Sequence, residues 1–143
     1  MFSHYSLPLS IIAAAVLLLN RHIIYRVRQR QHGIEHGTVV SVVDGDTIKV
    51  RINGKVETVR YIGVNTPERD EPGFAEATQK NRQLVAFRDV RLESDRSDED
   101  VYGRKLRYVW AGRTFVNREL VRLGCAKVMA VWPNTKRIRE IQE

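Results

Sequence analysis

The sequence has very little that could cross-link the chain or repeat within it. Its 143 residues contain one cysteine, Cys125, which excludes an internal disulfide and leaves the redox compartment undetermined. No internal repeat or low-complexity tract is visible, so solenoids are excluded. This length suits one domain with a hydrophobic core rather than two full domains. We therefore expect a single site, with Cys125 packed in the core.

Charged side chains are missing from the start of the chain. Residues 1–19 contain no Asp, Glu, Lys or Arg, and Leu7–Leu19 is almost wholly apolar. A membrane-spanning helix needs roughly 20 apolar residues, so we expect residues 1–20 to form a hydrophobic anchor helix. A cleaved signal peptide is the alternative, but it carries basic residues ahead of its apolar run, and here they follow it. A helix packed on the domain is disfavoured because the run has no polar face.

Four arginines follow the apolar run, at positions 21, 26, 28 and 30. We interpret residues 21–35 as a basic juxtamembrane linker, with residues 1–30 in contact with membrane lipid. Under the positive-inside rule, these arginines hold the following domain, residues 36–143, on the cytoplasmic side of a single-pass membrane protein. Export of the domain is the alternative. A protein that chiefly binds anionic lipid is another, but it explains only residues 21–30.

Positive charge exceeds negative charge over the whole chain. There are 24 Lys and Arg against 17 Asp and Glu, a formal charge of +7. Such a balance favours polyanionic partners, either nucleic acid or anionic lipid. No feature of the sequence indicates a protein partner, and we expect a monomer.

The remaining sequence alternates between short β-branched segments and two helical patterns. Asn53-Gly54 separates two of the β segments and is a strong signal for a type I′ hairpin turn. Phe74–Arg88 has apolar residues at helical spacing, and Asn117–Leu123 is a second predicted helix, which Gly124 ends. Five strands are predicted, at Thr38–Val43, Thr47–Ile52, Lys55–Ile62, Val90–Glu93 and Lys105–Trp110. This order predicts a mainly β fold with helices (α+β), arranged as a small barrel.

Two carboxylates flank Gly45 at the junction of the first two predicted strands. Oxygen ligands at such a junction can converge on a hard cation such as calcium. The alternative is an ordinary Asp-Gly turn, in which Asp44 and Asp46 bond to nearby backbone amides. Taken alone, these residues favour the ordinary turn.

Further polar residues come next to the later strands. Arg60 lies near the end of the third strand, and Asn65-Thr66-Pro67-Glu68 follows in a turn that proline stiffens. Arg104 comes just before the fifth strand, after an acidic loop. Phosphodiester hydrolysis needs a metal to screen the phosphate, a base to orient water and guanidinium donors, and these residues are candidates for each. For either arginine taken singly, a surface salt bridge is the alternative.

Five segments, in their order and spelling, resemble the staphylococcal nuclease, or thermonuclease, family: VDGDT, VRYIGVNTPE, GFAEAT, YGRKLRYVW and VNRELVRLGCAKV. The resemblance runs from about Gly37 to Asn134, and five motifs in the right order are highly specific. It implies a five-stranded Greek-key barrel of OB type. It also implies a calcium-dependent nuclease that cuts single-stranded DNA and RNA with little sequence specificity, either internally or from an end.

The resemblance implies roles for the acidic residues and their neighbours. Asp46 looks like the metal-binding carboxylate, and Thr66 looks like the residue that gives a backbone carbonyl to calcium. Asp44 would be a structural acid that holds the metal ligands in position without binding the metal itself. Glu68 looks like the general base for the attacking water.

The resemblance also implies how a nucleotide is held. Arg60 and Arg104 look like the two arginines that hold the scissile phosphate, the second also assisting the leaving group. Losing either should lower turnover strongly. Tyr102 and Trp132 resemble the aromatic positions that line the nucleotide pocket, where stacking on a base contributes roughly 1–3 kcal/mol. Packing in the core or at its rim is the alternative for both aromatic residues.

Three features depart from the family pattern. Asn65 stands where the best-known members have a second metal-binding aspartate. Its amide oxygen can still bind calcium, but it carries no negative charge, so we expect weaker metal binding. Ala130 replaces an aromatic wall of the nucleotide pocket, which predicts relaxed sugar specificity. The final helix, predicted at Lys136–Gln142, is short and lowers the expected stability.

A catalytically inactive module of OB type, which binds nucleic acid or docks a protein, is the alternative function. Asn65 keeps this alternative open. The presence of Asp46, Arg60, Glu68 and Arg104 together favours an enzyme, because random loss of function would not be expected to spare a base and both phosphate contacts.

Overall fold

The structure, a computed structural model, describes residues 33–143. The predicted anchor helix at 1–20, the four arginines of the basic linker and the lipid contacts and orientation inferred from them lie outside the described residues. Among residues 33–143, no helix is both long enough and apolar enough to span a membrane.

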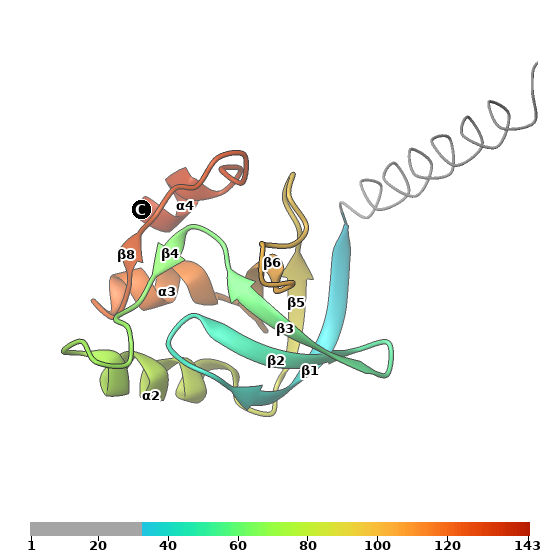
Figure 1. Ribbon diagram of the computed structural model, residues 1–143, viewed down its shortest axis with the longest axis horizontal. Helices are drawn as coiled ribbons and strands as arrows, with labels where there is room; N and C mark the ends of the chain where they lie inside the picture. Colours follow the sequence, from blue (N-terminus) through green and yellow to red (C-terminus); the bar gives the residue numbers. More distant parts are fainter. Residues whose placement is uncertain (1–32) are drawn as a thin grey trace, which may run out of the picture. The chain divides into compact units, whose positions relative to one another are not determined.

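Five strands form a closed barrel, which confirms the predicted fold class. They are β1 (Ile34–Val42), β2 (Thr47–Ile52), β3 (Lys55–Tyr61), β5 (Asp89–Glu93) and β6 (Lys105–Ala111). Neighbouring strands pair antiparallel in the order β3-β2-β1-β5-β6, and β3 also pairs with β6, in parallel, which closes the sheet on itself (Figure 1). Ile48, Val50 and Ile52 point into this barrel and are buried, whereas Lys49 and Arg51 between them are exposed.

The β2–β3 connection is the predicted tight hairpin. Asn53 and Gly54 both have positive φ, 49° and 82°, as a type I′ turn requires. The start of β1, in contrast, lies four residues before the predicted Thr38. Ile34–Thr38 pair with the distant strand β5, a contact that local sequence does not encode.

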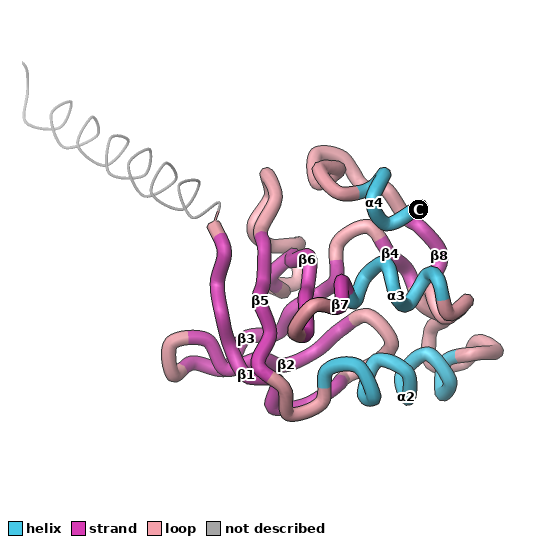
Figure 2. The backbone as a smooth tube through the Cα atoms, turned by 180° about the vertical axis from the view of Figure 1, so that it is seen from behind, coloured by secondary structure: helices cyan, strands magenta, loops and turns pink. Residues whose placement is uncertain are grey.

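Three helices lie on the same side of the barrel in both views: α2 (Phe74–Val85), α3 (Val116–Arg122) and α4 (Ile138–Gln142) (Figures 1 and 2). Helix α2 ends three residues before the predicted Arg88, because Phe87 adopts a left-handed conformation with φ 58°. Helix α4 is short but buries Ile141. Cys125 is buried, as predicted.

Three very short strands were not predicted. They are β4 (Val64–Asn65), β7 (Thr114–Phe115) and β8 (Lys127–Val128). β4 and β8 pair with each other as a separate two-stranded ribbon next to α3 and α4 (Figure 1). This ribbon places Asn65 beside the end of β3.

Candidate active site

Asp46 precedes β2 and is buried, with 5% of its surface exposed. Its Oδ2 atom accepts hydrogen bonds from the backbone N–H of Thr66, at 2.8 Å, and from the Thr66 hydroxyl, at 2.9 Å. Burial raises the pKa of the Asp46 carboxyl above its ordinary value, and the charge of Arg60 opposes this rise only in part. The carboxylate is therefore held rigidly against the residue that follows β4.

Gly45 makes this close approach of Asp46 and Thr66 sterically feasible. A Cβ atom at position 45 would lie 2.7 Å from Thr66 Oγ1 and 2.9 Å from the Cβ of Ala77 on α2. Any side chain would therefore push the loop away from Thr66 and from the helix. Position 45 therefore requires glycine, because there is no room for a side chain between Thr66 and Ala77.

A chain of hydrogen bonds, which runs through Asp44, Asn81 and Tyr61, holds the loop that carries Asp46 in place. Asp44 Oδ1 accepts from the backbone N–H of Asp46 at 3.0 Å, and Asn81 Nδ2 donates to the Asp44 carbonyl at 2.8 Å. Tyr61 in turn donates its hydroxyl to Asn81 Oδ1 at 2.8 Å, and burial raises the pKa of Tyr61 so that the hydroxyl keeps its proton. Sequence reasoning missed Asn81 and Tyr61. The available signal was a polar residue on the apolar face of α2.

Arg60 on β3 links Asp46 to β4. Its Nη1 donates to the carbonyls of Tyr61 and Val64, at 2.8 and 3.0 Å. Its Nη2 donates to Asn65 Oδ1 at 3.1 Å and lies 3.2 Å from Asp46 Oδ2. Only 12% of the Arg60 side chain is exposed, so this contact is not an ordinary surface salt bridge.

Arg60 and Arg104 line the same cleft, which has a volume of about 380 Å³. We call it the arginine cleft; its walls include Arg60, Ile62, Arg104, Leu106 and Trp132. It combines two cations with apolar side chains, and Glu99 and Asp100 add negative charge to its lining. Such a site can hold an anion beside a flat apolar group, as a nucleotide requires.

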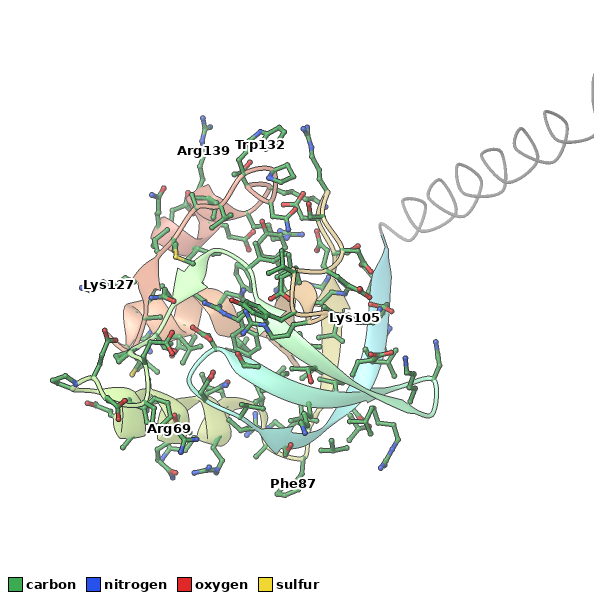
Figure 3. The ribbon with its side chains drawn as sticks, in the orientation of Figure 1. Arg69, Phe87, Lys105, Lys127, Trp132 and Arg139 are labelled. Atoms are coloured by element: carbon green, nitrogen blue, oxygen red, sulfur yellow. The ribbon has the colours of Figure 1, made fainter. Side chains whose placement is uncertain are left out.

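The predicted aromatic residues take different positions at this cleft. Trp132 lines it and is 81% exposed, which leaves its ring open for stacking (Figure 3). Tyr102 is equally exposed, on the turn next to the cleft, with the Arg104 guanidinium 5.4 Å from its ring centre. Ala130 is exposed, as expected of a position that provides no wall.

Asp100 holds Arg104 in position, a role that the sequence did not indicate. Its Oδ2 accepts from Arg104 Nε at 2.6 Å, and its Oδ1 accepts from the backbone N–H groups of Tyr102 and Arg104. Burial would raise the pKa of Asp100, but the hydrogen bonds from Arg104 outweigh it and lower that pKa. The available signal was an Asp four residues before an Arg, with Gly103 between them.

Glu68 is exposed on the turn that follows Thr66. Its backbone N–H donates to Glu71 Oε2 at 2.8 Å, and its carbonyl accepts from the Glu71 N–H at 2.9 Å. Within residues 33–143 no hydrogen bond or ion pair joins its carboxylate to Arg60 or Asp46. The structure thus brings Asp46, Asn65, Thr66 and Arg60 together, with Arg104 and Trp132 on the adjoining cleft, and leaves Glu68 in solvent.

The oxygen donors at this site suit a hard cation in type. Among residues 33–143, Asp46 Oδ1 accepts only a long hydrogen bond, 3.3 Å, from the Thr47 hydroxyl. The Asn65 amide oxygen contacts Arg60 Nη2, the nitrogen that also lies beside Asp46 Oδ2. Oxygen ligands of this kind are those that calcium prefers. Across residues 33–143, however, no three His, Cys, Asp or Glu side chains gather closely enough to form a metal site. The donor set therefore supplies few negative charges.

Comparison with known proteins gives consistent matches. Residues 58–143 match the family model described as staphylococcal nuclease homologue. The SPbeta prophage-derived endonuclease YokF of Bacillus subtilis is 40% identical over 114 residues, which cover 74% of this chain and 38% of that protein. The thermonuclease of Staphylococcus hyicus is 38% identical over 111 residues, covering 73% and 66%. Endonuclease YncB of Bacillus subtilis is 38% identical over 122 residues, covering 80% and 58%. The chain spans less than two thirds of the length of each of these relatives.

Proposed function

The chain belongs to the staphylococcal nuclease family, and we propose that it is a calcium-dependent nuclease that hydrolyses phosphodiester bonds of DNA, RNA or both. The observation that carries the proposal is the position of Arg60. It lines the arginine cleft together with Arg104, and it lies 3.2 Å from the buried carboxylate of Asp46. The arginine that we propose as a phosphate contact therefore lies directly beside the carboxylate that we propose as a metal ligand.

Each residue then has a chemical task. Asp46, Asn65 and the backbone carbonyl of Thr66 would hold calcium, which supplies positive charge to the phosphate when bound. Arg60 and Arg104 donate N–H groups to the phosphate oxygens, where charge develops in the transition state.

Water and the base of the nucleotide are handled by other side chains. Glu68 takes a proton from the water whose oxygen attacks phosphorus. The bond to the leaving oxygen breaks, Arg104 stabilises the negative charge on that oxygen, and the oxygen takes up a proton from solvent. Its exposed position leaves it free to reach a substrate. Trp132 stacks on a base and reads no particular sequence, because every base has a flat face.

Cleavage of heat-denatured DNA by the full chain tests the proposal, with calcium and with excess chelator. We expect cutting that requires calcium and is abolished by Glu68→Ala. Glu76→Ala, which removes an exposed carboxylate from α2, is the matched control and should cut normally. A folded protein that cuts at no calcium concentration would refute the nuclease.

The second candidate is a binding module without catalysis, and the single buried carboxylate at the site favours it. Asn65 supplies no charge, so a cation is attracted by Asp46 almost alone. This candidate predicts binding of single-stranded DNA that is unaffected by Glu68→Ala and produces no cleavage.

We also propose that the nuclease domain is tethered to a membrane, with the domain on the cytoplasmic side. The apolar run and the four arginines in residues 1–30 support this. Fractionation tests it: the full chain should stay with membranes in alkaline carbonate. Release into the soluble fraction would refute the tether.

A further inference from the structure

We propose that a second cleft, next to the site just described, binds a phosphodiester that flanks the scissile one, with Lys127 as its cationic contact. This inference rests on the proposed function. The cleft has a volume of about 410 Å³ and is lined by residues that include Asn65, Thr66, Pro67, Glu71, Cys125 and Lys127. We call it the ribbon cleft, because the β4–β8 ribbon forms one wall.

The ribbon cleft and the arginine cleft adjoin each other. Arg60 lines the arginine cleft, and Asn65 lines the ribbon cleft. The hydrogen bond from Arg60 Nη2 to Asn65 Oδ1, 3.1 Å long, joins the two walls. A strand that places one phosphate at Arg60 therefore has a second cleft directly beyond Asn65.

Lys127 is directed toward the same face as Asn65. The two residues are direct cross-strand partners in the antiparallel β4–β8 pair, and partners of this kind carry their side chains on one face. Lys127 is exposed, and Figure 3 shows it reaching away from the domain. Within residues 33–143 its ammonium forms no ion pair with a carboxylate, whereas Arg104 is bound to Asp100.

The other walls of the ribbon cleft suit a nucleotide. Pro67 and the buried Cys125 provide apolar surface against which a sugar or base can lie. Glu71 is the opposing charge, and its Oε2 already accepts the backbone N–H of Glu68 at 2.8 Å. Its negative charge directs a phosphate toward the Lys127 side. Lys127 is the one basic residue that lines the ribbon cleft in the described part of the chain, and it therefore serves one additional phosphate.

The arrangement predicts that binding depends on the length of the strand. A dinucleotide has one phosphodiester and fills only the arginine cleft, while an octanucleotide extends across both clefts. Each phosphate contact on a single strand adds about 0.7 to the slope of log affinity against log salt. Removing the positive charge of Lys127 should therefore weaken binding of the octanucleotide but not binding of the dinucleotide.

The test measures fluorescence anisotropy of labelled oligothymidylates with the full chain in calcium, on a Glu68→Gln background that prevents cleavage. Lys127→Gln should weaken octanucleotide binding about threefold to tenfold at low salt and lower the salt slope by about 0.7. Dinucleotide binding should not change. Lys127→Arg, which keeps the positive charge, should bind the octanucleotide as tightly as the parent protein does. Arg88→Gln is the charge-matched control. It alters the residue after Phe87, at the end of the domain opposite Trp132 (Figure 3), and should have no effect.

Each outcome decides the proposal. An equal loss for both lengths, an unchanged octanucleotide, or a parent protein that does not bind the octanucleotide overturns the ribbon cleft. Cutting of denatured DNA separates this result from the proposed function. If the parent protein cuts DNA but Lys127→Gln does not change octanucleotide binding, only the second subsite is refuted. If Lys127→Gln weakens octanucleotide binding but the parent protein never cuts DNA, only the nuclease is refuted.

Discussion

Arg60 Nη2 donates to Asn65 Oδ1 at 3.1 Å while it lies 3.2 Å from Asp46 Oδ2, so one guanidinium nitrogen joins the two side chains proposed to bind calcium. Because one partner is a neutral amide, Arg60 balances a single carboxylate. A second carboxylate at position 65 would keep the contact to Arg60 and add negative charge for a cation.

Asn65→Asp should therefore bind calcium more tightly. We expect the calcium concentration for half-maximal cleavage to fall about tenfold, because calcium affinity rises with ligand charge. Calorimetric titration with calcium checks this without relying on turnover. Asn53→Asp, at the exposed hairpin tip, makes the same chemical change away from the site and should have no effect. An Asn65→Asp protein that binds calcium no more tightly than the parent contradicts the assignment.

Asp100→Asn should lower kcat about tenfold with little change in KM, because Arg104 loses the partner that orients it for the transition state. The amide can still accept the two backbone hydrogen bonds that Asp100 Oδ1 receives, so the turn is preserved. Steady-state kinetics on denatured DNA measures the effect. Glu76→Gln removes an exposed carboxylate on α2, outside the arginine cleft, and should leave kcat near the parent value. Equal loss in both variants would show that the contact between Asp100 and Arg104 is not the cause.

Gly45→Ala should destabilise the domain by about 1–3 kcal/mol, since the added methyl group overlaps Thr66 and Ala77. Urea unfolding followed by circular dichroism gives the change in free energy. Gly33→Ala is the control, because a Cβ atom there meets nothing within 4 Å. If both substitutions cost the same, the close approach at Gly45 is not what stabilises this loop.

Stability should fall in acid through Glu93. Burial would raise its pKa, but hydrogen bonds from Arg137 and Lys136 outweigh burial and lower it below the ordinary 4.5. The unfolded state therefore binds more protons at Glu93 in this range, and the stability that it contributes is complete above pH 4.5 and lost as pH falls through the lowered value. Urea unfolding at a series of pH values tests this. Glu93→Gln should be less stable at neutral pH and show a shallower decline in acid; an unchanged slope would contradict the linkage.

The local elements were predictable because their signals are local. Asn53-Gly54 specified a hairpin turn on its own, since both residues tolerate positive φ. Alternation in β2 and helical spacing in α2 placed a strand and a helix, although the end of α2 at Val85 depended on the conformation of Phe87. The selection of Asp46, Arg60 and Arg104 as candidate site residues came from the order of five motifs rather than from any one motif.

Contacts between distant segments were decided only by the tertiary structure. The parallel pairing of β3 with β6 closes the barrel, and it brings Arg60 and Arg104 to one cleft although 44 positions separate them in the sequence. The pairing of Asn65 with Lys127 and the hydrogen bond from Asn81 to Asp44 also join residues that are far apart along the chain. The sequence by itself determined which residues are candidates for the site and which segments turn, coil or extend. Which of those residues touch depended on how the apolar faces pack together, because burial stabilises contacts without regard to their separation in the chain.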